Sequence, residues 1–524
     1  MFDVIIVGTG ASSTAAALEL QDKKLLIIDT GIEVSKSLKI DKNIFDLKRS
    51  DENQRDYLIG ENFESLANIG SKDLVSIKLK SPLTSFVIDN NETLIKIKSN
   101  NFSPFLSYAY GGLANAWGAG VYRYTDYDLK KFPISSTELE PFYNKLTDLI
   151  GISGENDDLQ PFFGKIRGLQ KPLKLNVNCN YLYSSYLKKK KYFLKKGISI
   201  GKTQLTVLTE EKDDRSAYNC NNTSFFTCDN PSIYTPAISM NQIKQRPNVT
   251  FKKGFIVESF EDKNGFVQVN AIEIKNRKEV SFIGKKLLLG AGTINTGKIV
   301  LQSFKDYKAR LPILDNPISF IPFVNIRAIG SKTDQSGYEG GQLILIYEGS
   351  LSSEYVQGSF YSYISPLRSD IFFDFPLSIK GNLSLTKFIV PGMTILQLFY
   401  PDTPKKQNYI QLKKDKTLFI NYTDVPVLGK LERHIIKSFW MTGFITMPFL
   451  VQYPRPGNSI HYAGTIPMGK NNVNYFVDKY CCLNRTKNVY LIDGSVFPIL
   501  PAKNLTFTLM ANAMRIAQFI RDKI

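Results

Sequence analysis

The first thirty residues alternate between short apolar runs and a stretch of helical composition. Phe2–Gly8 is an apolar run that ends in glycine, and Leu25–Ile28 is a second run that ends in Asp29. Between them lies A-A-A-L-E-L, a stretch of good helix formers. Short apolar runs of this kind are typical of buried parallel strands. The pattern therefore predicts a strand, a helix and a second, parallel strand.

The turn after the first predicted strand has the composition of a phosphate-binding turn. Its residues are Gly8, Thr9, Gly10, Ala11, Ser12 and Ser13. Gly8 allows a tight turn, Gly10 lets a pyrophosphate approach the backbone, and the helix N-terminus favours negative charge. Asp29, nineteen residues after Gly10, can accept hydrogen bonds from a ribose hydroxyl. Ser13 replaces the third glycine of the pattern and weakens the match. The motif predicts a dinucleotide cofactor but does not separate FAD from NAD.

Residues 306–452 have a different pattern, with strand-like alternation in S-F-I-P-F-V-N-I-R-A and Q-L-I-L-I-Y. Such alternation is typical of antiparallel strands with one buried face. A chain of 524 residues is also too long for one ordinary core. We therefore expect a second, mostly antiparallel lobe.

Composition narrows the class of protein. The chain is 43% hydrophobic and has no run near the roughly 18 apolar residues of a membrane span. We find no secretory signal pattern and expect a cytoplasmic protein. The five cysteines are residues 179, 220, 228, 481 and 482. An odd count without a CxxC pair fits a reducing compartment, and Cys220 and Cys228 lack two further ligands nearby, so we predict no metal site.

The net charge of +18 leaves two interpretations open. The lysines are spread along the chain without a nucleic-acid-binding motif, so we expect no nucleic acid. The densest group is Lys188–Lys191 with Lys195 and Lys196, next to apolar residues at helical spacing, which favours a solvated helix face that ends at Gly197. The alternative is attraction to an anionic partner, either a phosphorylated substrate or an acidic membrane surface. Peripheral membrane association therefore stays open.

Three further motifs resemble those of one enzyme family. They are Gly111-Gly112-x-x-Asn115-x-Trp117-Gly118, His461-x-x-Gly464-Thr465-x-x-Met468-Gly469 and Leu491-Ile-Asp493-Gly-Ser495-x-Phe-Pro498. They resemble the second flavin-contacting loop, the active-site histidine motif and the late strand of the glucose–methanol–choline (GMC) oxidoreductases. Residues 132–143 and 149–154 are similar to its bacterial members, the pyranose oxidase and gluconate dehydrogenase-like branch. Without the resemblance, residues 108–120 leave a second interpretation open, namely a glycine-rich loop that binds no ligand.

The resemblance implies an α/β fold. It comprises a Rossmann-like FAD-binding domain, of the type shared with p-hydroxybenzoate hydroxylase, and an interleaved α+β substrate domain with an antiparallel sheet. The FAD-binding domain would be discontinuous, at residues 1–130, 200–305 and 455–524. The substrate domain and connecting segments would take residues 131–199 and 306–454.

The resemblance also implies the site residues. Beyond the N-terminal turn, the cofactor contacts would be Gly112, Asn115, Trp117, Val257, Ala291, Asp493, Gly494, Leu505 and Thr506. His461, one of two histidines in the chain, would be the catalytic base, and Asn504 would take the second catalytic position. The other, His434, falls on an amphipathic helical pattern and is expected to be a packed or surface residue. Some relatives attach FAD to a histidine where this chain has Ala116, so we expect noncovalent FAD.

These residues suit the oxidation of an alcohol to a carbonyl. A neutral imidazole can take the hydroxyl proton near neutral pH, and an amide can hold the oxygen without competing for the proton. The resemblance to the pyranose oxidase-like branch suggests that the substrate is a sugar or a polyol. The net charge of +18 leaves open that the substrate is anionic. The alternatives are a non-redox lyase with the same fold and a flavin-binding protein without turnover. The electron acceptor (oxygen, a quinone or a redox protein) and the oligomeric state cannot be predicted from the sequence.

Overall fold

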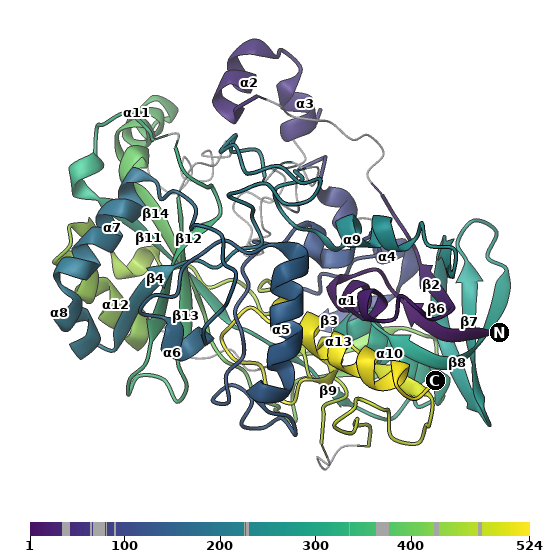
Figure 1. Cartoon of the computed structure of the whole chain (residues 1–524). Helices are drawn as coiled ribbons and strands as arrows, with labels where there is room; N and C mark the ends of the chain where they lie inside the picture. The colour runs from purple at the N-terminus through teal and green to yellow at the C-terminus, as the bar shows by residue number, and fades with distance from the viewer. Residues whose placement is uncertain are drawn as a thin grey trace.

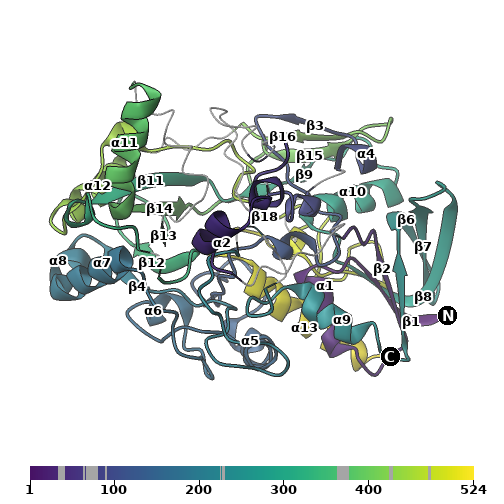
Figure 2. The same ribbon diagram turned by 90° about the horizontal axis from the view of Figure 1, so that it is seen from above.

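A computed structural model describes most of the chain. The described residues are 1–33, 42–62, 65, 79, 81–88, 91–224, 226, 230–334, 336–362, 377–423, 429–469 and 474–524. Cys228, which was considered above as a metal ligand, lies outside these ranges. Two lobes lie next to each other, and both termini belong to the same lobe (Figures 1 and 2).

The first lobe is built on a seven-stranded sheet with a parallel centre. Its strands in spatial order are β5 (Val249–Lys253), β2 (Leu25–Asp29), β1 (Phe2–Val7), β8 (Glu279–Leu289), β7 (Phe266–Glu273) and β6 (Phe255–Lys263), with β19 (Val489–Leu491) paired to β8. β1 is parallel to β2 and β8, whereas β6, β7 and β8 run antiparallel. Val4, Ile5 and Ile6 are fully buried, as expected for a central strand covered on both faces. The predicted strand, helix and parallel strand are confirmed.

Five helices pack around this sheet. They are α1 (Ala11–Glu19), α5 (Ser136–Ile150), α9 (Pro236–Ile243), α10 (Thr293–Ser303) and α13 (Thr506–Arg521). α1 packs against α13 and α9, α13 packs against α5, and α10 packs against β6. Ser135 begins α5 with a capping box, because its hydroxyl accepts the Glu138 N–H while the Glu138 side chain accepts the Ser135 N–H.

The second lobe contains a six-stranded antiparallel sheet. Its strands in spatial order are β17 (Phe444–Ile445), β11 (Ile318–Asn325), β14 (Met393–Phe399), β13 (Val356–Ser362), β12 (Gly341–Tyr347) and β4 (Ile198–Lys202). The antiparallel sheet predicted for residues 306–452 is confirmed, and β4 joins it from outside that range. Helices α7 (Val177–Lys188), α8 (Lys190–Lys195) and α12 (Lys430–Trp440) contribute to a common apolar core with this sheet.

The lysine-rich stretch forms two helices and not one. α7 ends at Lys188 and α8 begins at Lys190, while Gly197 follows with φ 72°, a left-handed conformation suited to a helix end. Tyr186 and Phe193 are buried, so these two aromatic side chains anchor the stretch to the second lobe.

The described residues also form two smaller sheets. One contains β3 (Ile97–Asn100), β16 (Leu418–Asn421), β15 (Tyr409–Leu412) and β9 (Leu311–Pro312). The other pairs β10 (Leu314–Asp315) with β18 (Tyr462–Ala463), which places Asp315 opposite Tyr462. This short ladder joins the segment that leads into β11 to the residue that follows His461.

The other helices among the described residues have 3 to 11 residues. They are α2 (Ile44–Ser50), α3 (Gln54–Leu58), α4 (Asn91–Leu94), α6 (Gln160–Phe163) and α11 (Ile379–Ile389), and the 3-10 helices η3 (Ser85–Val87), η4 (Gly112–Asn115), η5 (Ile326–Ala328), η7 (Val390–Gly392), η8 (Pro448–Leu450) and η9 (Gly494–Val496). α11 lies at the outer edge of the second lobe in both views (Figures 1 and 2). Within the described part of the chain, every helix is too short or too polar to cross a membrane.

Candidate active site

A cavity of about 1620 Å³ is lined by residues of both lobes. Sites for a single small ligand are usually about 300–1,000 Å³, so this cavity has room for a dinucleotide and a substrate together. The predicted site residues that line it are Gly8, Gly10, Ala11, Ser12, Asp29, Gly112, Trp117, Val257, Ala291, His461, Asp493, Gly494, Asn504, Leu505 and Thr506. Residues predicted from both ends and the middle of the sequence thus meet around one space.

The β1–α1 turn presents its backbone to this cavity. Gly8 has φ 95°, and a Cβ there would lie 2.5 Å from the Gly290 carbonyl oxygen, so only glycine fits. A Cβ at Gly10 would meet no atom of the described chain within 4 Å. No side chain among the described residues caps the N-terminus of α1. Its first N–H groups are therefore available to an anion such as a pyrophosphate.

Asp29 lies at the end of β2 with its carboxylate in a buried hydrogen-bonded position. It accepts the Thr9 hydroxyl at 3.0 Å and the Gly31 N–H at 2.5 Å, and burial raises its pKa to about 7. The Thr9 hydroxyl in turn accepts the Gly111 N–H at 2.9 Å. Thr9 therefore joins Asp29 to the second glycine-rich loop, a role that the sequence motif did not indicate.

Ser13 and Asn115, which were also predicted to contact the cofactor, lie outside the cavity lining. The Ser13 hydroxyl is buried and lies 3.2 Å from the Val7 carbonyl oxygen and 3.3 Å from that of Gly290, where it packs α1 against β1 and β8. The Asn115 amide donates to the carbonyl oxygens of Tyr110, at 2.7 Å, and Gly112, at 3.0 Å. Both side chains hold the backbone of a cavity-lining turn in place.

Asp493 has a similar supporting role at the start of α10. Its carboxylate accepts the Gly292 N–H at 2.9 Å, the Thr296 hydroxyl at 2.5 Å and the Ser495 N–H at 3.0 Å. Burial raises the pKa of this carboxyl group. The Asp493 side chain therefore fixes the turn between β19 and η9 against α10, next to Gly494 in the cavity wall.

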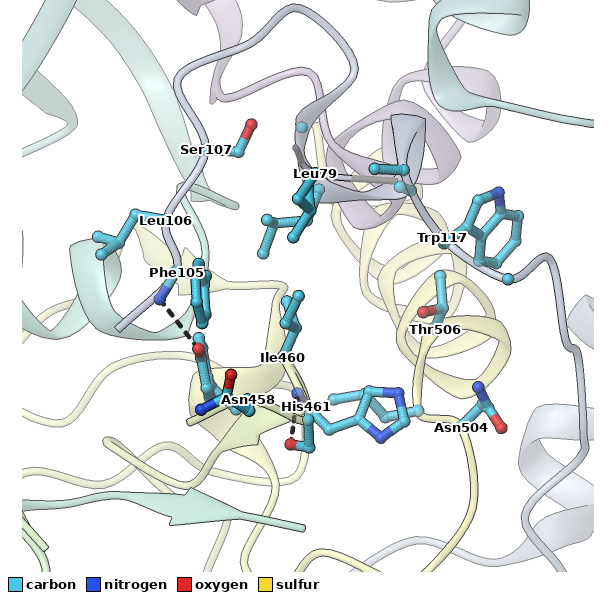
Figure 3. A pocket seen from close by; sticks show the side chains of 18 of the residues that line it. Leu79, Phe105, Leu106, Ser107, Trp117, Asn458, Ile460, His461, Asn504 and Thr506 are labelled. Atoms are coloured by element: carbon cyan, nitrogen blue, oxygen red, sulfur yellow. Dashed lines mark hydrogen bonds between the residues drawn. The ribbon is translucent and has the colours of Figure 1, made fainter. Parts of the chain in front are cut away.

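His461 is half-buried, and contacts of both its ring and its backbone fix its position. Its ring stacks on Phe399, with centroids 5.1 Å apart and an angle of 22° between the planes. Its backbone N–H donates to the Ser459 hydroxyl at 3.0 Å, as the dashed line in Figure 3 shows, and its Nδ1 lies 3.1 Å from Oδ1 of Asn316. Burial lowers the pKa of His461 to about 4, so the ring is neutral at neutral pH.

The hydrogen bonds of Asn316 determine which imidazole nitrogen carries the proton. Its NH₂ group donates to the carbonyl oxygens of Tyr400, at 2.8 Å, and Pro501, at 3.1 Å. Its Oδ1 therefore faces His461 as an acceptor, and Nδ1 of the neutral ring must be the donor. Nε2 is then the unprotonated nitrogen, which is the form that a general base needs.

Asn504 is held in a complementary way. Gln357, on β13, donates its Nε2–H to Oδ1 of Asn504 at 3.0 Å. The Asn504 amide therefore presents its NH₂ group as a donor. In Figure 3 the His461 ring extends toward the side of the cavity on which Asn504 and Thr506 lie. A substrate oxygen in this region would meet one acceptor, Nε2 of His461, and one donor, the Asn504 amide.

Four residues that support this arrangement were not predicted: Asn316, Gln357, Phe399 and Asp315. Asp315 is buried and accepts the Gly457 N–H at 2.7 Å and the Ser459 hydroxyl, and burial raises its pKa to about 8. All four belong to the second lobe or to the segment that leads into it, outside any glycine-rich motif. A polar residue in an apolar stretch, as in L-P-I-L-D-N, is the one signal that the sequence offered.

The other histidine has no part in the site. His434, on α12, is partly buried: its Nε2 bonds to the Lys196 carbonyl oxygen at 2.9 Å, and its ring packs edge-on against Tyr347. Among the described residues, no cluster of three or more His, Cys, Asp or Glu side chains is placed to hold a metal ion.

Comparisons with known proteins bear on the family and the fold of the chain. Residues 451–513 match the family described as GMC oxidoreductase, and this range includes both His461 and Asn504. No curated protein matches the chain by sequence. The structure is similar to pyridoxine 4-oxidase from Mesorbium loti, with a TM-score of 0.60, 12% identity and 99% of each chain covered. At 12% identity, this likeness shows that the whole chain has the same fold, and it says nothing about the substrate. The chain therefore matches the GMC oxidoreductase family over residues 451–513, and over its whole length it shares the fold of pyridoxine 4-oxidase.

Proposed function

We propose that this protein oxidises an alcohol to a carbonyl with noncovalently bound FAD. The observation that carries the proposal is the Asn316–His461 hydrogen bond, which keeps Nδ1 protonated and leaves Nε2 free to accept a proton. The cavity joins this nitrogen to a helix N-terminus suited to a pyrophosphate.

The residues of the first lobe fit an FAD molecule. The open space beside Gly10 and the α1 N-terminus would hold the pyrophosphate, and Asp29 would accept a ribose hydroxyl. The N-terminus of α13, which no side chain among the described residues caps, adds a second set of backbone donors at Leu505. When bound, FAD supplies a two-electron acceptor for the hydride that leaves the alcohol carbon.

His461 and Asn504 account for the proton and the oxygen. The alcohol loses its hydroxyl proton to Nε2 of His461 as its carbon becomes a carbonyl carbon. General-base catalysis of this type contributes about 10²–10⁴-fold. The Asn504 NH₂ group, oriented by Gln357, donates to the substrate oxygen and stabilises the negative charge that develops there.

Anaerobic flavin reduction tests the proposal directly. His461→Ala should bind FAD with the wild-type visible spectrum and reduce it at least about 100-fold more slowly with any alcohol that reduces the wild type. His434→Ala is the matched control, because that histidine lies on α12 outside the cavity lining, and its rate should equal that of wild type. Equal rates for His461→Ala and wild type would refute His461 as the base.

Two further outcomes separate the alternatives. If the flavin of the wild type stays oxidised with every alcohol, sugar and polyol, a non-redox lyase or a flavin-binding protein without turnover replaces the proposed function. Ala116 stands where some relatives attach FAD to a histidine, so acid precipitation should release all of the flavin into the supernatant. Yellow colour in the pellet would contradict noncovalent binding. The same reduced enzyme, mixed with oxygen, a quinone or a cytochrome, identifies the electron acceptor.

A further inference from the structure

The part of the cavity formed by the second lobe is mostly apolar. Its lining includes Phe320, Val324, Met393, Ile395, Phe449 and Leu450. A sugar has a hydroxyl on almost every carbon, and each one needs a hydrogen-bonding partner when it is buried. A lining of this kind instead suits a hydrocarbon chain or ring system with one hydroxyl group at the His461 end.

The mouth of this apolar part is itself apolar. Ile445, Met447, Phe449 and Tyr453 line the cavity and are also exposed to solvent, with Phe449 exposed to 82%. Large apolar side chains that are both exposed and in the wall of a cavity must lie at its rim. Apolar surface gathered in one place on a protein marks an interaction site.

Helix α11, next to this mouth, has its polar and apolar faces reversed. Asn382 and Thr386 point inward and are buried, whereas Ile379 is 89% exposed and Leu383 and Phe388 are also exposed. An ordinary surface helix buries its apolar face instead. Thr386 also lines the cavity, so the helix belongs to the same rim.

The segments that form this surface carry only positive charge. Residues 326–332, 377–390 and 440–455 contain no aspartate or glutamate. Their charged residues are Arg327, Lys332, Lys380, Lys387 and Arg455. The segments are joined in space, because the Gly330 N–H donates to the Phe388 carbonyl oxygen at 2.8 Å and the Ile326 N–H donates to that of Gly443 at 3.0 Å. Exposed apolar residues flanked by lysine and arginine are the pattern of an interfacial membrane helix.

We propose that α11 and the apolar mouth dock onto an anionic lipid bilayer, and that the substrate is a lipophilic alcohol that enters the cavity from the bilayer. The substrate part of this inference rests on the proposed function, whereas the docking part does not. A rigid protein partner on this surface would close the entrance. A fluid bilayer covers the exposed apolar side chains and still delivers lipid-soluble molecules to the cavity. The alcohol leaves as the aldehyde or ketone, with its hydride on FAD and its proton on His461.

Co-sedimentation of the full-length, FAD-loaded protein with vesicles tests the docking. Vesicles of phosphatidylcholine and phosphatidylglycerol in equal parts should bind the wild type. Ile379→Ser/Leu383→Ser should lower the partition coefficient more than about tenfold, because two side chains no longer leave water on binding. Leu187→Ser/Leu194→Ser removes two exposed leucines from α7 and α8 and should bind as wild type does.

The lysines of α11 are tested in the same assay. Lys380→Gln/Lys387→Gln should weaken binding to the mixed vesicles about 30-fold, at about 1 kcal/mol for each lysine, and leave the weaker binding to pure phosphatidylcholine unchanged. Lys275→Gln/Lys278→Gln, on the exposed turn between β7 and β8, is the matched control. Equal vesicle binding by wild type and Ile379→Ser/Leu383→Ser overturns the docking, as does a wild type that binds no vesicles; in the latter case a protein partner becomes the explanation of the surface.

Anaerobic flavin reduction tests the substrate class separately. Farnesol carried in the mixed vesicles should reduce the flavin, and D-glucose should not. Reduction by glucose and not by farnesol overturns the substrate class while the proposed function holds. If neither these two nor any other alcohol reduces the flavin, the proposed function fails and takes the substrate class with it, whereas sedimentation still decides the docking.

Discussion

Nδ1 of His461 lies 3.1 Å from Oδ1 of Asn316, and the amide of Asn316 is turned so that its oxygen faces the ring. His461 lies directly before β18, whereas Asn316 lies between β10 and β11 at the entry to the second lobe. The proton position on the proposed base is therefore determined by a residue from the other part of the molecule.

Removing this hydrogen bond should impair catalysis without removing the base. Asn316→Ala should slow flavin reduction by about 10–100-fold, because the neutral ring can then place its proton on either nitrogen and rotate. FAD content, measured from the visible spectrum, should stay at the wild-type level. Asn316→Asp keeps an acceptor and adds a negative charge, so it should raise the pKa of His461 and move the acid limb of the rate profile to higher pH. Wild-type rates and an unshifted profile in both variants would rule out this role for Asn316.

The rate of flavin reduction should depend on pH through His461 itself. Only the neutral ring can accept the substrate proton, and burial lowers the pKa of this ring to about 4. The rate should therefore stay level as the pH falls through 6.5 and decline only as it approaches 4. Stopped-flow reduction at saturating alcohol gives this profile. A half-maximal rate near pH 6.5 would mean that His461 is solvated or is not the group that titrates.

The buried ion pair next to Asn504 should contribute strongly to stability. Lys503 donates to the Asp128 carboxylate at 2.5 Å and to the Arg123 carbonyl oxygen at 3.0 Å, and both charged side chains are wholly buried. Lys503→Met would leave Asp128 buried and unpaired and should lower the free energy of unfolding by about 3–5 kcal/mol.

An exposed ion pair nearby provides the control for this change. Lys130→Met breaks the pair between Lys130 and Glu354, which is partly solvated, and should cost less than about 1 kcal/mol. Denaturant unfolding of both variants measures the two losses in the free energy of unfolding, provided that the dependence of this free energy on denaturant concentration has the same slope in both. Similar losses of unfolding free energy in the two variants would show that the buried Lys503–Asp128 pair stabilises the protein no more than the exposed pair does.

The two glycines of the β1–α1 turn should respond differently to substitution. Gly10→Val adds a side chain in open space beside the α1 N-terminus, so the protein should fold with little change in melting temperature but bind FAD at least about tenfold more weakly. Gly8→Val meets the Gly290 carbonyl oxygen and has a left-handed φ of 95°, so it should lower the melting temperature itself. Calorimetry of the apoproteins and FAD titration separate these effects. Normal FAD affinity in Gly10→Val would place the cofactor elsewhere.

The local features of the fold could be predicted because short-range physics determines them. Apolar runs between Phe2 and Asp29 and the glycines at 8 and 10 define a strand, a turn and a helix start within one stretch of chain. Alternation in residues 318–325 likewise predicted an antiparallel strand. These elements need no knowledge of distant residues.

The supporting residues of the site could not be predicted in this way. Asn316 and His461 are 145 positions apart in the sequence, and Gln357 and Asn504 are 147 positions apart. No periodicity connects residues at such separations. Asn115 and Ser13 were predicted from their motifs as cofactor contacts, but a motif does not state which way a side chain points. α11 is a different case, because periodicity favours burial of the apolar face of a helix, whereas Asn382 and Thr386 are the buried residues of α11.

The position of Asn316 has a consequence for protein engineering. Chimeric enzymes are often built by exchanging a substrate-binding region between relatives while the cofactor-binding region is kept. In this chain such an exchange across residues 306–454 would replace the amide that orients the proposed base, and also Gln357, which orients Asn504. A chimera that keeps its own Asn316 and Gln357 should retain chemical competence with a new pocket, whereas one that transfers the whole region would change selectivity and proton transfer together.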